Sequence, residues 1–137
     1  MGQVITEITL INAADAENVY RGFISAEEVR KAVVEAVVDT GATYLAITEE
    51  LYAKLGLREA EIKNVHLANG SVMRCVITSG VILQCQKRET VLPAVVVPGA
   101  TKVLLGALPL EAMDFMVHPL KQKLVGVHGD EELLMIL

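Results

Sequence analysis

The segment VVDTGATYL, residues 37–45, places a carboxylate, Asp39, at the end of an apolar run and a glycine, Gly41, two residues later. A carboxylate can take a proton from water or give one to a substrate, which is the basis of general acid–base catalysis. An aspartate also forms turns, because its side chain accepts hydrogen bonds from nearby backbone N–H groups. At typical residue frequencies Asp-Thr-Gly occurs by chance in roughly a few per cent of chains of this length. The tripeptide alone therefore leaves both interpretations open.

The other side chains that could carry chemistry lack the spacing of known sites. His66, His118 and His128 match no metal-ligand spacing, and we expect them on the surface or satisfied within the core. Cys75 and Cys85 form neither a zinc motif nor a secreted disulfide framework. We expect reduced core thiols, with a bridge across neighbouring strands as the alternative. With no phosphate-binding glycine loop, Gly-x-Ser-x-Gly elbow or Cys/His nucleophile pair in the sequence, we predict neither a metal nor a cofactor.

Composition and charge limit the class of protein. The 137 residues are enough for one core and too few for two. Apolar residues make up 53% of the chain, but Pro93, Pro98, Gly80 and charged residues interrupt them well before the length of a membrane span. The net charge of −5 repels phosphate backbones, and aromatic residues are few. We therefore predict a soluble protein with no membrane or nucleic-acid partner.

The amino-terminal segment MGQVITEITL has none of the three regions of a signal peptide, which favours a cytoplasmic protein. Its Met-Gly-x-x-x-Thr spacing matches a myristoylation signal, but no basic cluster follows to supply a second membrane anchor. A chance match is the preferred interpretation.

Hydrophobic periodicity indicates the elements that lead to Asp39. A strand is expected at Val4–Ile11, and NAADAENVY, residues 12–20, reads as a surface loop. The next segment, residues 25–39, is ambiguous. Ser25 and Glu28 have the spacing of a helix capping box, whereas alternating apolar residues favour a strand that ends at Asp39. The strand is the preferred interpretation.

Beyond Asp39 the signals are those of short strands with a helix or two. LAI, residues 45–47, reads as a short strand, and TEELYAKLG, residues 48–56, has an N-cap threonine, acids in its first turn and a terminal glycine. Asn69-Gly70 is a preferred two-residue hairpin turn. Two more strands are expected around Gln86–Thr90, then a short helix at Leu108–Met113 and two final short strands. Such spacing predicts a mainly β fold with a closed or folded-over sheet.

In this order the motifs resemble the retropepsin-like aspartic proteases, and in particular their small bacterial and archaeal members. DTGA, Asp39–Ala42, matches the family's active-site loop at all four positions. LLG, with Leu104, Leu105 and Gly106, matches the apolar segment that braces this loop. ANGS, Ala68–Ser71, lies where the family has the tip of a β-hairpin flap. The resemblance implies one retropepsin-like β-barrel domain at 1–137, with its core at 19–127 and a tail at 128–137.

The resemblance implies peptide-bond hydrolysis by two carboxyls and one water. One group must take a proton from water while another donates to the carbonyl oxygen, and one aspartate cannot do both. Two carboxyls that share a proton divide these roles, as the aspartic proteases illustrate. Asp39 is the only aspartate in such a motif. The second must come from another copy of the chain, which implies a homodimer with its active site on the two-fold axis.

The other residues acquire roles by the same resemblance. Thr40 would bond across the axis to the partner loop, Gly41 would permit close approach, and Ala42 would be small because the substrate lies over it. The flap residues Ala68, Asn69, Gly70 and Ser71 would close over an extended peptide. Ile47, Val72 and the Leu104 region are candidate walls of apolar pockets.

The sequence departs from the viral pattern at two positions. Viral members follow DTGA with an acid and follow the brace glycine with arginine or asparagine, whereas this chain has Thr43 and Ala107. A dimer assembled differently could keep the two aspartates apart. The alternative function is therefore an inactive peptide-binding or assembly module with Asp39 as a turn residue, and a weaker one is a protease that processes itself. The apolar end of the tail, Leu133–Leu137, is either disordered or paired with the amino-terminal strand.

Overall fold

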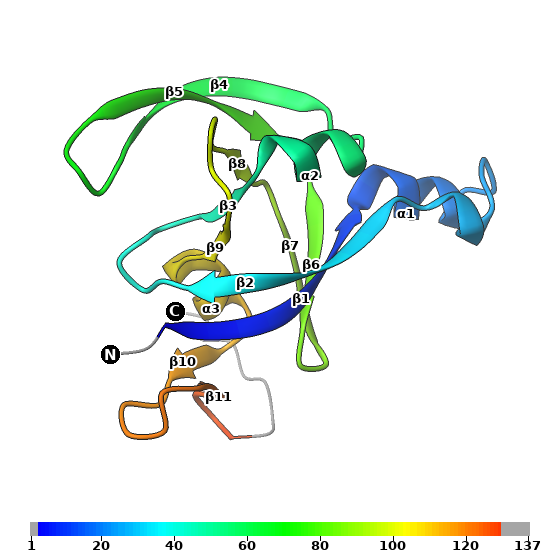
Figure 1. Ribbon diagram of the computed structural model, residues 1–137. Coiled ribbons are helices and arrows are strands. Elements are labelled where there is room, and N and C mark those ends of the chain that lie inside the picture. The colour runs from blue at the N-terminus through cyan, green and yellow to red at the C-terminus, as the bar shows by residue number, and fades with distance from the viewer. Residues whose placement is uncertain (1–2, 130–137) are drawn as a thin grey trace, which may run out of the picture.

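The computed structural model describes residues 3–129. Its main feature is one curled nine-stranded sheet with the order β4-β5-β8-β3-β9-β2-β1-β6-β7, beside a separate β10-β11 hairpin (Figure 1). The strands are β1 (Val4–Asn12), β2 (Lys31–Val38), β3 (Leu45–Ile47), β4 (Glu59–His66), β5 (Val72–Thr78), β6 (Val81–Cys85), β7 (Arg88–Leu92), β8 (Val95–Val96), β9 (Val103–Leu105), β10 (Phe115–Val117) and β11 (Leu124–Gly126). The prediction of a mainly β, folded-over sheet is confirmed.

Four short helical elements join the strands: α1 (Ala13–Tyr20), the 3-10 helix η1 (Ala26–Glu28), α2 (Glu49–Lys54) and α3 (Ala107–Ala112). The predicted helix at 48–56 is α2, whose N-cap Thr48 accepts a hydrogen bond from the Leu51 N–H. The surface loop predicted at 12–20 is wrong, because this segment forms α1. The Asn12 side chain caps that helix by accepting from the Asp15 N–H at 3.0 Å.

Both patterns in the ambiguous segment at 25–39, the capping box and the strand alternation, correspond to elements of the structure. Ser25 and Glu28 form a capping box on η1, and the alternating residues after it form β2. The helix signal ends within a turn because the backbone at Val29 is already extended. Local capping and strand periodicity therefore act on successive parts of one segment.

The β4–β5 and β6–β7 hairpins form where the sequence predicts them, but their turns differ from the prediction. The β6–β7 turn is the two-residue one, with positive φ at both Gln86 and Lys87, as a type I′ turn requires. The Asn69-Gly70 tip lies instead in a longer loop, because the last β4–β5 pair is His66 with Val72. The two-residue turn predicted at Asn69-Gly70 is therefore wrong.

The core lies inside the curled sheet. Ile8, Leu10, Leu83 and Leu105 are fully buried, with at most 1% exposure. Strand β1 pairs with both β2 and β6, so the sheet extends to the amino-terminal side of residue 19.

The two final short strands form as expected, although they lie apart from the nine-stranded sheet. β10 and β11 form their own hairpin, although Phe115 and Leu124 pack into the same core. The expectation for the tail at Leu133–Leu137 lies outside the described residues. Among helices at residues 3–129, none is both long and apolar enough to span a bilayer.

Candidate active site

Asp39 directly follows β2, where three strands meet. β9 lies between β2 and β3, parallel to β2 and antiparallel to β3. Val38 is paired with Leu105, and Leu45 is paired with the same residue from the other side. The loop at 39–44 therefore has to cross over the end of β9, which separates the strands on either side of it.

Backbone hydrogen bonds fix this loop onto the segment after β9. The Asp39 N–H donates to the Leu105 carbonyl at 3.0 Å, and the Ala107 N–H donates to the Ala42 carbonyl at 2.8 Å. The Leu108 N–H donates to the Thr43 carbonyl at 2.9 Å. The DTGA and LLG motifs predicted to form a loop and its brace are thus brought together.

Gly106 allows this close packing because it has no side chain. A Cβ atom built there would lie 2.5 Å from the Tyr44 carbonyl oxygen and 2.8 Å from that of Ala42. These are backbone atoms that cannot rotate away, so the position accepts only glycine without a shift of the loop. The glycine of the predicted brace thus has a steric reason.

The Asp39 side chain remains partly accessible at the end of the strand. Its Oδ1 accepts a hydrogen bond from the Gly41 N–H at 3.0 Å, which is a local turn of the kind aspartate often forms. Thr40 and Gly41 are exposed, and Ala42 is half-buried. The carboxylate is held in position by the loop and can still meet another molecule.

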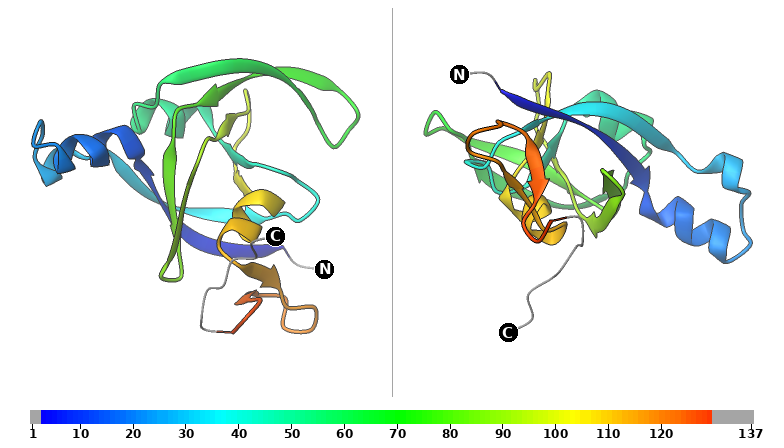
Figure 2. Two further views of the ribbon diagram at one scale, coloured as in Figure 1. Left: turned by 180° about the vertical axis from the view of Figure 1, so that it is seen from behind. Right: turned by 90° about the horizontal axis from the view of Figure 1, so that it is seen from below.

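The β4–β5 hairpin projects over the same side of the molecule as the Asp39 loop. The view in Figure 1 and the views from behind and from below in Figure 2 agree that its tip and the loop at 39–44 lie at the same end of the molecule. In the tip, Asn69 Oδ1 accepts from the N–H and hydroxyl of Ser71, and Gly70 has a φ of +87°. Ala68 to Ser71 are all exposed, which suits a segment that contacts a ligand.

The candidate pocket walls divide into two groups. Ile47 has no exposed surface and packs in the core, so the prediction that it lines an open pocket is wrong. Val72 is 55% exposed at the base of the hairpin tip, and Leu104 is half-buried. Two exposed apolar residues at the Asp39 loop, Tyr44 and Leu108, are not predicted from the sequence. Their exposure is visible only once the loop is placed on the segment after β9.

The other titratable candidates lie elsewhere. His118 Nδ1 accepts from two backbone N–H groups, and His128 contacts the Asp114 carboxylate at 2.7 Å. No group of three possible metal ligands occurs within residues 3–129. Cys75 and Cys85 are free and buried on strands that are not neighbours, and burial raises the pKa of both thiols. A bridge across neighbouring strands is therefore not formed.

Fold and site together define a retroviral-type protease scaffold, and comparisons with known proteins agree. Residues 27–112 match the model of the family described as gag-polyprotein putative aspartyl protease. Because this match covers more than half of the chain, the protein belongs to that family. It is retropepsin-like, as the sequence motifs predicted.

A solved structure shows the same fold. EIAV protease complexed with the inhibitor HBY-793 aligns with a TM-score of 0.56 over 80% of this chain and 86% of that one, at 14% identity. At this identity the likeness concerns the fold alone. Among curated proteins, no sequence gives a significant match.

Proposed function

We propose that the protein is a homodimeric aspartic endopeptidase in which two copies of Asp39 activate a water molecule to hydrolyse an extended peptide. The observation that carries this proposal is the β2-β9-β3 crossing, which holds a partly accessible carboxylate on a loop braced at Gly106. A catalytic group has to be held by rigid elements and still reach its substrate. Asp39 meets both conditions, and membership of the aspartyl protease family supports the reaction class.

The division of labour follows from proton transfer. One Asp39 carboxylate removes a proton from water as the water attacks the peptide carbonyl, while the other carboxyl donates a proton to the carbonyl oxygen. Proton transfer to the nitrogen then releases the amine. Thr40 and Gly41, exposed on the same loop, would meet their counterparts at the two-fold axis. The reaction calls on no group beyond these carboxyls and water.

Two exposed apolar residues support a second copy as the partner. Tyr44 and Leu108 are 53% and 47% exposed. Tyr44 is the last residue of the Asp39 loop, and the Leu108 N–H donates to the carbonyl of its neighbour Thr43. Thr43 and Ala107 occupy the places of charged or amide residues in viral dimers, so this dimer would rely on apolar contacts instead. Burial of aromatic and aliphatic side chains at the centre of an interface is a strong source of affinity. We also propose that the dimer acts in the cytoplasm.

The flap role of Ala68–Ser71 is part of the same proposal. Closure of the β4–β5 tip over a bound peptide would exclude water other than the nucleophile. The hydrogen bonds that shape the tip join residues within 67–71, and residues 68–71 are exposed to a ligand. An extended substrate would bind between this tip and the Asp39 loop.

The test is cleavage of an unfolded polypeptide, such as reduced and carboxymethylated α-lactalbumin, across about pH 4 to 7. In this range a pair of carboxyls that share a proton is half-protonated, so a bell-shaped rate profile is expected. The fraction of dimer is measured by sedimentation over a range of protein concentrations, and the cleavage rate should rise in proportion to it. A dimer without cleavage anywhere in this range would favour the inactive binding module. Intact masses of wild type and Asp39→Asn that differ only by the substitution itself would exclude self-processing.

A further inference from the structure

A groove of about 750 Å³ lies between β2 and α2. Its walls come from the start of β1, from β2, from α2 and from residues 100–103, which lead into β9. Val37 lines it and is two positions from Asp39. The groove thus begins next to the candidate active site, and its volume lies in the usual range for ligand sites.

The edge of β2 that borders the groove is only partly covered by another strand. β1 pairs with β2 along its whole length, whereas β9 pairs only with residues 36–38. Within residues 3–129, no strand pairs with residues 31–35 of β2 on the β9 side. An open sheet edge presents backbone groups that can accept another strand.

Two hydrogen bonds show which way the backbone groups point. The Asn12 N–H donates to the Arg30 carbonyl at 3.0 Å, so Arg30 turns its backbone groups toward β1. Along an antiparallel pair of strands, opposed residues alternate between pairs that exchange backbone hydrogen bonds and pairs that do not. The backbone N–H and C=O groups of even-numbered residues of β2 therefore point toward β1, and those of odd-numbered residues point away from it. The Asp39 N–H follows this rule, because it donates to Leu105. By the same alternation the Glu35 N–H points toward the groove.

We propose that this edge binds a flanking stretch of the polypeptide substrate as an added β-strand, outside the segment that is cleaved. The proposal rests on the proposed function. Strand addition gains affinity from main-chain hydrogen bonds and so tolerates many sequences. Glu35 lies four positions before Asp39, which is about 13 Å along a strand. A substrate with its scissile bond at Asp39 would reach the groove with residues about four positions away, and this continuity favours substrate over other occupants.

The lining indicates the kind of segment that fits. Its charged residues are Glu35, Glu49, Glu50, Lys54 and Lys102. Carboxylates outnumber ammonium groups, while Ile5 and Val37 give an apolar base. We therefore expect extended segments in which apolar residues alternate with basic ones to bind best.

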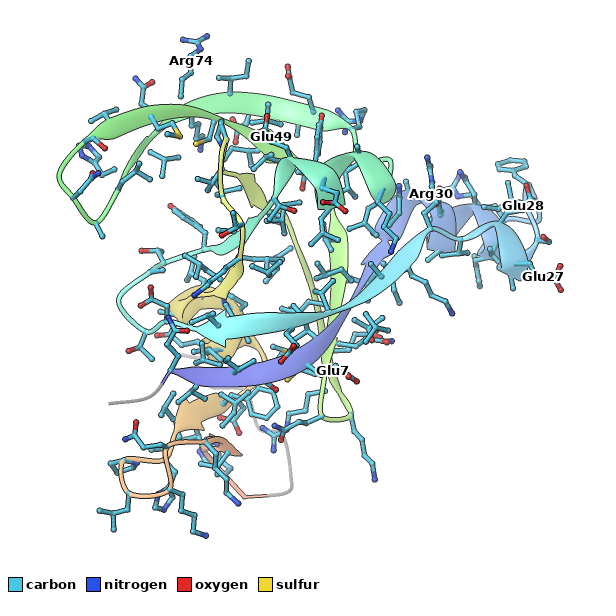
Figure 3. All side chains as sticks on the ribbon, in the orientation of Figure 1. Glu7, Glu27, Glu28, Arg30, Glu49 and Arg74 are labelled. Atoms are coloured by element: carbon cyan, nitrogen blue, oxygen red, sulfur yellow. The ribbon has the colours of Figure 1, made fainter. Side chains whose placement is uncertain are left out.

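Glu35→Pro tests the edge directly, because proline removes the groove-facing N–H and is tolerated where a strand edge is open. Glu7→Pro is a matched control. Glu7 lies directly opposite Glu35 in the β1–β2 register and turns its N–H away from β2. Figure 3 shows Glu7 on one side of β2 and Glu49 of α2 on the other. Glu50→Trp is a second variant, which fills the groove from an exposed position on α2 without changing a strand.

Binding is measured in the Asp39→Asn background by fluorescence anisotropy of a dye-labelled basic unfolded polypeptide, reduced and carboxamidomethylated lysozyme, with circular dichroism to check folding. We expect Glu35→Pro and Glu50→Trp each to raise Kd at least about fivefold, and Glu7→Pro to leave it unchanged. Unchanged Kd in both groove variants, an equal loss in Glu7→Pro, or no binding by the parent would overturn the proposal. Wild-type cleavage of the same polypeptide is assayed separately. Groove-dependent binding without cleavage would contradict the proposed enzyme activity and not the groove.

Discussion

Asp15 and Asp39 are two carboxylates held in opposite ways. Asp15 is buried on α1 and accepts three hydrogen bonds from Arg30, from its backbone N–H and from guanidinium atoms Nε and Nη2, at 2.9 to 3.0 Å. The hydrogen bond from the Arg30 side chain, opposed by desolvation, lowers the pKa of Asp15. Asp39 accepts from the Gly41 backbone and keeps part of its surface accessible.

The difference separates a structural acid from a candidate catalytic one. A carboxylate locked to a guanidinium stays ionised and cannot cycle a proton at ordinary pH. Asp15 thus fastens α1 to the start of β2. Asp39 is held in place by backbone alone, so its carboxylate stays available to a second copy and to water. Four predictions test this contrast, in order of decreasing effect.

Replacing Asp39 by asparagine should lower kcat on the unfolded polypeptide by at least about 10³-fold, because an amide cannot exchange protons with water and substrate. The asparagine oxygen can still accept from the Gly41 N–H, so the thermal midpoint should stay close to that of wild type. Steady-state kinetics and calorimetry measure the two quantities. Retained turnover would show that Asp39 is a turn residue like any other.

Gly106→Ala should lower the free energy of unfolding by about 3 kcal/mol or more, because its Cβ meets fixed carbonyl oxygens of the Asp39 loop. Gly80→Ala is the matched control. Its Cβ would lie 3.5 Å from its nearest neighbours, an ordinary contact, so we expect a change within about 1 kcal/mol. Urea denaturation measures both. Equal losses would mean that the brace is not specially packed.

Asp15→Asn should lower the free energy of unfolding by about 1 to 2 kcal/mol, since the Arg30 side chain is 52% exposed and solvent weakens the pair. Turnover per folded molecule should not change. This is the reverse of the expected result for Asp39→Asn. A loss of turnover at unchanged stability would erase the distinction between the two acids.

The same pair predicts a small pH effect. The folded pKa of Asp15 lies below the unfolded value of about 3.9. Its contribution to stability is therefore complete well above pH 4 and is lost as the pH falls from there through the lower folded pKa. The stability difference between wild type and Asp15→Asn should shrink over that window, by about 1 kcal/mol or less given the exposure of Arg30. A difference that grows on acidification would contradict this role.

Helix caps and strand alternation were predicted correctly, because they depend on residues close together in the chain. Thr48 and Gly56 bracket α2 by capping, and alternation found β2 and the hairpin strands. The α1 helix was missed because its polar residues gave no apolar face. Tertiary contacts hold it: the Asp15–Arg30 pair and the buried Asn12 cap, whose side-chain amide also donates to the Leu55 carbonyl at 2.9 Å.

The sequence was sufficient to predict the motif residues of the candidate site, but not which neighbouring side chains are exposed around them. Asp39 and Gly106 were found because their motifs are short and ordered. Periodicity does not show which apolar residues face a cleft, and the prediction of Ile47 as a pocket wall is wrong for this reason, since Ile47 lies in the core. Tyr44 and Leu108 were missed because their exposure depends on a pairing between distant segments. The open edge of β2 likewise follows from where β9 begins.

The insertion of β9 between β2 and β3 also sets an order of events during synthesis. The β4–β5 and β6–β7 hairpins join neighbouring segments and can form as soon as they are made. The Asp39 loop cannot take its shape until residues 103–108 arrive to lie under it. A chain still emerging from the ribosome therefore lacks a formed Asp39 loop until translation has passed β9.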